Sequence, residues 1–341
     1  MLDYVVLDSV VAVIAIARGS ASLVRLPISA DTLRALVARL RQPLVAINGG
    51  RLDLARAPFS LGTAARLHAA LVRPLASVLA GKRRLIVVPD GPLHALPFEA
   101  LVVSADTDQA TAPDYTGAEY LMDAYEVAYL PSSSFLTQSD AKRAESLSGS
   151  RLLVVSYGAP GAEREAEALR VEWPTGSTTL LAGTAATEHA AKAVMAQYDV
   201  IHFAVHAQAS ARDPLASHLR LAPDAVEDSY LHLDEIAAGK VGARLVVLSA
   251  CETDAGPIYN GEGVMGLARA FLASGTRNVV GTLWPVGPTT AELMKEFYRR
   301  LAIGEAPAAA LRGAKIAMRS ARVTAHPFYW AGAVLVEGGG R

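Results

Sequence analysis

Two short apolar runs in the second half of the chain constrain its fold most strongly. Residues 200–205 read VIHFAV and end at His206, and residues 245–250 read LVVLSA and end at Cys251. Runs of this length and composition are typical of strands that are buried on both faces of a parallel sheet. In open α/β sheets, ligands bind where such strands give way to loops. The pattern therefore predicts an imidazole and a thiol at one edge of one sheet.

Composition limits the classes of function. The formal net charge is −1 and no long basic run is present, which argues against a nucleic-acid or membrane partner. Residues 10–17 are apolar enough for a signal-peptide core, but Asp3 and Asp8 precede them and no Lys or Arg does. No run approaches the roughly 20 apolar residues of a membrane-spanning helix. Because Cys251 is the only cysteine, no internal disulfide can form, and the cytoplasm is the expected location.

Alternating strand and helix patterns predict an α/β protein with a mostly parallel, doubly wound sheet flanked by helices. A polar segment near 139–150 divides the chain into two predicted portions, 1–150 and 151–341. The first is expected to contain strands at 4–7, 10–17, 22–26, 84–88 and 126–130 and helices at 30–40 and 62–79. The second is expected to contain strands at 152–156, 178–181, 200–205, 245–250, 278–283 and 332–336, a hairpin within 219–233, and helices at 163–172, 187–197, 264–273, 290–301 and 307–320. Thr187 is the expected N-cap of the second of these helices.

Cys251 and His206 are the candidate nucleophile and base. A free thiol has a pKa of about 8.5, so it needs a neighbouring base to react at neutral pH. An alternative interpretation is that Cys251 is a small buried hydrophobic residue. His202 is expected in the core, four residues before His206 on the same face of the strand. A zinc site built from His202, His206 and Cys251 is a weaker alternative because no fourth ligand has recognisable spacing.

Several residues near Cys251 are candidates for a substrate pocket. Asp254 and Glu262 could accept a basic substrate side chain or lie in a solvated loop, and Trp284 could line a pocket or pack beneath the loop. Residues 261–266 match G-x-G-x-x-G. A dinucleotide site requires these glycines directly after a strand and an acidic residue about 20 positions further on. Here the preceding strand ends ten residues earlier and the acidic residue is missing, so no dinucleotide site is expected.

Several motifs in this chain resemble the CHAT domain, a caspase-like module related to separase. They are IHFAVH (201–206), LVVLSACET (245–253), GEGVMGLARAFL (261–272), GTLWPV (281–286) and HPFYWA (326–331), with VPDGPL (88–93) and LPFEAL (96–101) upstream. The resemblance implies a cysteine endopeptidase acting on protein or peptide substrates without a metal or organic cofactor. By the same resemblance, His206 is the catalytic histidine, Cys251 is the nucleophile, and the amides of Ala207 and Cys251 form the oxyanion hole. Residues 1–150 would be a non-catalytic, caspase-like portion and 151–341 the catalytic portion.

The chain departs from the family pattern at two positions. Ala207 stands where the family usually has glycine after the histidine, and Asp254 stands where it usually has glycine after Cys-Glu-Thr. Ala207 would be strained if that position required a positive φ. The printed sequence also contains no tetratricopeptide repeat, so a regulatory protein could supply that part. The alternatives are therefore an active peptidase, a peptidase that is latent until a partner orders residues 253–262, and an inactive pseudo-peptidase that serves as a protein-interaction module.

Overall fold

A computed structural model describes most of the chain. The described residues are 1–17, 19–45, 54, 58–105, 113–138, 146–159, 161–174, 177–208, 216–249, 251–252, 262–284 and 290–338, and for 251, 252 and 262–264 the description covers the backbone. No helix in these ranges is long and apolar enough to cross a lipid bilayer.

One mixed sheet of fourteen strands forms the centre of the molecule, with main order β12-β11-β10-β13-β15-β16-β7-β4-β1-β2-β3. Off this path, β14 and β8 pair with β10, and β9 pairs with β8. The strands of this sheet are β1 Leu2–Val6, β2 Val11–Ala17, β3 Ser20–Arg25, β4 Arg84–Val88, β7 Glu126–Tyr129, β8 Leu152–Tyr157, β9 Thr178–Ala182, β10 Val200–Gln208, β11 His218–Arg220, β12 Tyr230–His232, β13 Leu245–Leu248, β14 Cys251–Glu252, β15 Asn278–Thr282 and β16 Ala333–Glu337. Strands β5 Val102–Ser104 and β6 Glu119–Tyr120 pair separately.

The predicted α/β class with a mostly parallel sheet is confirmed. In the second half, β9, β8, β10, β13 and β15 are parallel neighbours, and β16 closes the series antiparallel to β15. The first six residues of β10 and all residues of β13 are buried, as their apolar runs indicate. The hairpin within 219–233 forms from β11 and β12, and the Thr187 side chain caps α6 by accepting from the Ala190 amide at 3.1 Å.

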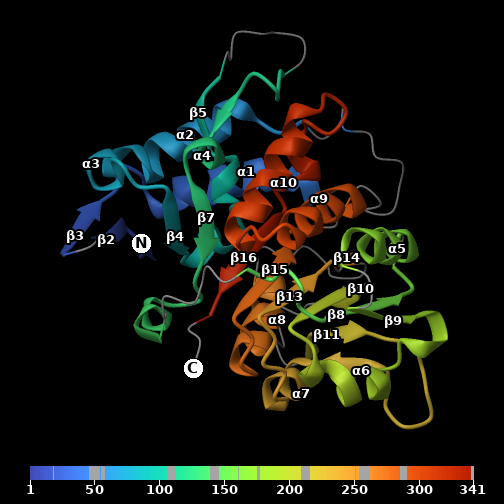
Figure 1. Ribbon diagram of the computed structural model, residues 1–341. Coiled ribbons are helices and arrows are strands. Elements are labelled where there is room, and N and C mark those ends of the chain that lie inside the picture. Colours follow the sequence, from blue (N-terminus) through green and yellow to red (C-terminus); the bar gives the residue numbers. More distant parts are fainter. Residues whose placement is uncertain are drawn as a thin grey trace.

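Helices cover both faces of the sheet. Helices α5, α9 and α10 pack together on one face, and α6, α7 and α8 lie on the other (Figure 1). The α-helices are α1 Ala30–Val45, α2 Leu61–Leu71, α3 Ala76–Leu79, α4 Leu121–Ala124, α5 Ala162–Glu172, α6 Glu188–Val194, α7 Leu233–Ala238, α8 Glu262–Ala273, α9 Thr290–Ala302 and α10 Pro307–Ser320. The helix expected over 62–79 is interrupted between α2 and α3 by a 3₁₀ turn at Arg73–Leu75. Pro74 explains the interruption, because proline has no backbone N–H to donate and its ring clashes with the preceding turn of a helix.

The sheet runs through both halves of the chain without a break. The last strand, β16, pairs in parallel with β7, so the end of the chain lies beside the first half (Figure 1). The predicted boundary falls mainly on 139–145, outside the described residues. The division into 1–150 and 151–341 stays a prediction, and the two portions share one hydrophobic core.

A buried ion pair also joins the two halves. The Lys315 ammonium in α10 lies 2.7 Å from one oxygen of Glu99, and the Tyr129 hydroxyl donates to the other at 2.5 Å. The side chains of Lys315 and Glu99 are 1% and 4% exposed. Burial and the Glu99 charge raise the pKa of Tyr129 well above its usual range, so Tyr129 remains a hydrogen-bond donor.

Replacing Lys315 with methionine tests this pair. We expect Lys315→Met to destabilise the protein by about 3–5 kcal/mol, because the buried Glu99 carboxylate loses its cation. The urea midpoint of unfolding measures the loss. Arg170→Met is the matched control, since Arg170 pairs with Glu167 on the exposed side of α5. Equal midpoint shifts in the two variants would contradict the assignment.

Candidate active site

His206 lies where β10 passes from one set of partners to another. The last residue pair between β10 and β8 is Val205 with Tyr157, and β8 ends there. One position further, the Cα of His206 is paired with that of Cys251 in β14, in parallel, and with that of Arg220 in β11. The structure therefore places the two predicted residues on adjacent strands in direct register.

The ring nitrogens of His206 have different environments. Nε2 lies 3.0 Å from the carbonyl oxygen of Gly158, directly after β8. Because a carbonyl only accepts, Nε2 carries the proton in the neutral ring. Nδ1 is buried and has no hydrogen-bond partner among the described residues. A histidine held in this way has a buried lone pair on Nδ1 that can accept a proton.

The conformation of Gly158 allows its carbonyl to reach His206. Gly158 has φ +69°, which turns the chain out of β8 towards α5. A Cβ at this position would lie 3.6 Å from Cδ2 of His206, an ordinary contact, so the positive φ and not crowding requires glycine. Gly158 was not recognised from the sequence, although a glycine directly after a buried strand was a usable signal.

Ala207 continues β10 with ordinary extended backbone. It is 4% exposed and paired with Leu219 of β11 on one side and Glu252 of β14 on the other. Ser229 is the only non-glycine residue with positive φ in the described part of the chain. Ala207 is therefore not strained in this structure. Its amide can serve an oxyanion only where the flanking strands leave it unpaired.

The three candidate pocket residues are placed unequally. Asp254 lies outside the described residues. Glu262 begins α8, and its backbone alone is described. Trp284 is 2% exposed, and its indole N–H donates to the Phe328 carbonyl at 3.0 Å. Packing accounts for the position of Trp284 here, and a role in a substrate pocket stays a prediction.

His202 is part of a buried polar cluster. It is fully buried, with Nδ1 3.1 Å from the hydroxyl of Tyr298 and Nε2 3.1 Å from a carboxylate oxygen of Glu165. Ser249 donates to the other oxygen of Glu165 at 3.0 Å. Nε2 of His202 and the Glu165 oxygen facing it lie within ion-pair distance but have no hydrogen-bond partner among the described residues. Glu165 was not recognised from the sequence, although it shares the buried face of α5 with Leu169, four residues on.

One group of carboxylates has the spacing of a metal site. Oxygens of Glu188, Glu227 and Glu235 lie within 4.8 Å of one another. The Lys192 ammonium pairs with all three, at 2.5 Å from Glu235 and 3.4 Å from Glu227. Burial opposes the charge on Lys192, but the hydrogen bonds that its ammonium donates to Glu188 and Glu235 outweigh burial and raise the pKa of Lys192. The lysine therefore already supplies the cation for these carboxylates.

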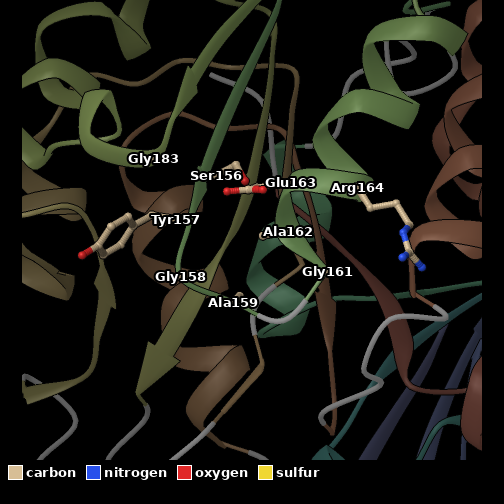
Figure 2. Close-up of a pocket in the computed structure, with 9 residues that line it drawn as sticks. All are labelled: Ser156, Tyr157, Gly158, Ala159, Gly161, Ala162, Glu163, Arg164 and Gly183. Carbon is tan, nitrogen blue, oxygen red and sulfur yellow. The ribbon is translucent and has the colours of Figure 1, made fainter.

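A hollow of about 440 Å³ lies beside the Gly158 turn. It is lined by the end of β8, the first turn of α5 and Gly183. Ser156 and Glu163 lie at the centre of the view, whereas the side chains of Tyr157 and Arg164 extend to opposite sides (Figure 2). The Ser156 hydroxyl is fully buried and has no hydrogen-bond partner among the described residues. Gly158, whose carbonyl oxygen contacts the His206 ring, is one of the residues that line this hollow.

Comparison with solved structures finds the separase–securin complex of Saccharomyces cerevisiae. The match to one structure of this complex covers 82% of the present chain and 17% of the matched chain, with 13% sequence identity and a TM-score of 0.47. A second covers 84% and 18%, with 13% identity and a TM-score of 0.48.

Sequence comparison finds much longer relatives. Tetratricopeptide repeat protein 28 of Homo sapiens is 26% identical over 307 residues, which cover 74% of this chain and 12% of that protein. The Mus musculus protein of the same name is 25% identical over 307 residues, with the same shares covered. This chain thus corresponds to about 12% of the length of these relatives. The CHAT domain model matches residues 61–337, and the chain therefore belongs to the CHAT domain family.

Proposed function

We propose that this protein is a cysteine endopeptidase of the caspase-like clan, with Cys251 as nucleophile and His206 as general base and acid. The register pair between His206 and Cys251 carries the proposal. Paired residues on neighbouring parallel strands lie about 4.8 Å apart, which is within reach of a proton transfer between their side chains. The buried, unpartnered Nδ1 of His206 supports the same assignment.

The proposed reaction follows from the hydrogen bond to Gly158. With its proton on Nε2, His206 takes the Cys251 proton on Nδ1, and the thiolate attacks the substrate carbonyl. The imidazolium then protonates the leaving amine, and a thioester remains on Cys251. Water hydrolyses this thioester and returns the proton to the thiol. The amides of Ala207 and Cys251 would stabilise the oxyanion, and no metal or organic cofactor takes part.

Regulation by a partner protein is part of this proposal. Ala207 lies between β11 and β14, so a substrate or partner would have to move whichever strand pairs with its amide before that amide could bind an oxyanion. The long relatives of this chain are named for tetratricopeptide repeats, which supports a partner of that kind. Because a catalytic thiol must stay reduced, we place the protein in the cytoplasm.

A second candidate is an inactive CHAT module that binds proteins in a signalling or defence complex. The same enclosed position of Ala207 favours it, because an amide held in a ladder cannot bind an oxyanion. The thiol measurement below separates the two functions: the module predicts an ordinary thiol, and the peptidase predicts an activated one.

The reactivity of Cys251 tests the peptidase directly, since it is the only cysteine in the chain. We expect iodoacetamide to alkylate the native protein at pH 7 about tenfold faster than it alkylates His206→Ala, because the imidazole raises the thiolate fraction. His189→Ala, in the exposed part of α6, is the matched control and should react like the native protein. Equal rates in all three folded proteins would favour the inactive module.

The protonation state of His206 provides a second test. We expect ¹⁵N shifts of the neutral ring to show protonated Nε2 and unprotonated Nδ1, because the Gly158 carbonyl accepts from Nε2. Gly158→Ala should move the ring towards a mixture of tautomers. Gly149→Ala is the control, because Gly149 also has a positive φ, +77°, but nothing lies within 4 Å of an added Cβ. A ring protonated mainly on Nδ1 would contradict the mechanism.

Substrate preference is a further prediction. Asp254 in the sequence and Glu163 beside the hollow both favour a basic side chain before the scissile bond. A peptide library should therefore show cleavage after Arg or Lys, and Asp254→Asn should weaken that preference. A profile that is indifferent to charge would exclude this preference and leave the dyad untouched.

A further inference from the structure

We propose that Glu165 is a positioning residue that sets the geometry of the Cys251–His206 pair. This inference rests on the proposed peptidase function. Glu165 does not belong to the pair itself: it lies in α5, and its direct partners are His202 and Ser249. We name Glu165, His202, Ser249 and Tyr298 the Glu165 cluster.

The cluster is closed to solvent. His202 is 0% exposed, Glu165 5% and Ser249 7%, and Tyr298 is among the fully buried residues. Burial, together with the Glu165 charge, raises the pKa of Tyr298 well above its usual range. The Tyr298 hydroxyl therefore keeps its proton and can donate it to Nδ1 of His202.

Two contacts involve the Glu165 carboxylate. Ser249 donates to one oxygen at 3.0 Å. Nε2 of His202 lies 3.1 Å from the other oxygen, within ion-pair distance, but neither of these two atoms has a hydrogen-bond partner among the described residues. With Nδ1 accepting from Tyr298, the proton of a neutral His202 ring is on Nε2 and faces this oxygen.

The segments tied by Glu165 are those that carry the candidate dyad. The turn at Gly158, which binds His206, leads directly into α5, so Glu165 fixes this helix close to the turn. His202 belongs to β10, four residues before His206. Ser249 lies two positions before Cys251, and its own amide donates to Phe203 of β10 at 2.9 Å. One carboxylate therefore sets the spacing of the Gly158 turn, the His206 strand and the approach to Cys251.

Stability alone is a poor reason for this arrangement. Among the described residues no Lys or Arg pairs with Glu165, whereas the buried Glu99 has Lys315. A buried anion with one hydroxyl donor and no Lys or Arg partner carries a desolvation cost that an apolar side chain would avoid. A misplacement of about 1 Å, even from a residue remote from the chemistry, can slow an enzyme about 100-fold, which gives such a cluster a catalytic purpose.

The test uses the full chain and the alkylation of its single thiol by iodoacetamide as a function of pH. Glu165→Gln keeps the size of the side chain but removes its charge and leaves one acceptor oxygen where the carboxylate faces both Ser249 and His202. We expect it to slow alkylation at pH 7 about tenfold and to move the pH profile towards that of an ordinary thiol. Ser249→Ala removes the contact nearest to Cys251 and should act in the same direction, and it decides the question if Glu165→Gln does not fold.

Two control variants separate positioning from general stability. Glu99→Gln changes the other buried carboxylate, which lies outside the Glu165 cluster, and Glu167→Gln removes an exposed charge from the same helix. Both should keep the native profile within about twofold, with thermal unfolding measured for every variant. Native profiles in Glu165→Gln and Ser249→Ala, or an equal shift in Glu99→Gln, would overturn the inference. Identical profiles for the native protein and His206→Ala would instead remove the proposed function, and this inference with it.

Discussion

Hydrogen bonding along both edges of β10 is the constraint on which the candidate site depends. This strand is longer than its neighbours, so it pairs with β8 and β13 in the core and then continues between β11 and β14. His206 occupies the first position of that continuation. On one side β8 has ended and the Gly158 carbonyl binds the ring, and on the other side β14 brings in Cys251. A shift of one residue in this register would turn His206 to the opposite face of the sheet.

Two buried carboxylates show how burial serves different purposes in one molecule. Glu99 has a full positive charge beside it and joins the two halves of the chain, where a continuous sheet already unites them. Glu165 accepts from the Ser249 hydroxyl, lies beside the His202 ring, and is placed among the segments that lead to the candidate dyad. The first arrangement balances charge at an internal contact. The second accepts a desolvation cost at a place where geometry matters for chemistry.

The same strand pairing bears on regulation. A two-residue strand such as β14 adds few hydrogen bonds, so its separation from β10 costs less than the opening of a core strand. Under the proposed regulation by a partner, β14 is therefore the element that costs least to move.

Sequence patterns predicted much of the fold. The apolar runs at 200–205 and 245–250 indicated buried parallel strands, and Thr187 was correctly identified as a helix cap. The pattern over 62–79 was interpreted as one helix because apolar spacing outweighed Pro74. For the candidate site, the carboxyl ends of two expected strands pointed to His206 and Cys251. Neither Gly158 nor Glu165 was recognised from the sequence. Both act through contacts with residues more than 35 positions away.

The sequence by itself thus determined most of the strands and helices and the α/β class, because hydrophobic periodicity and capping are local properties. It predicted strand ends at His206 and Cys251, whereas in the structure β10 continues to Gln208 and Cys251 begins β14. Tertiary structure alone decided the register between β10 and β14, the pairing of β16 with β7, the tautomer of His206 and the partners of Glu165. These depend on which backbone and polar groups meet after the sheet has assembled. A local pattern carries no record of such distant contacts.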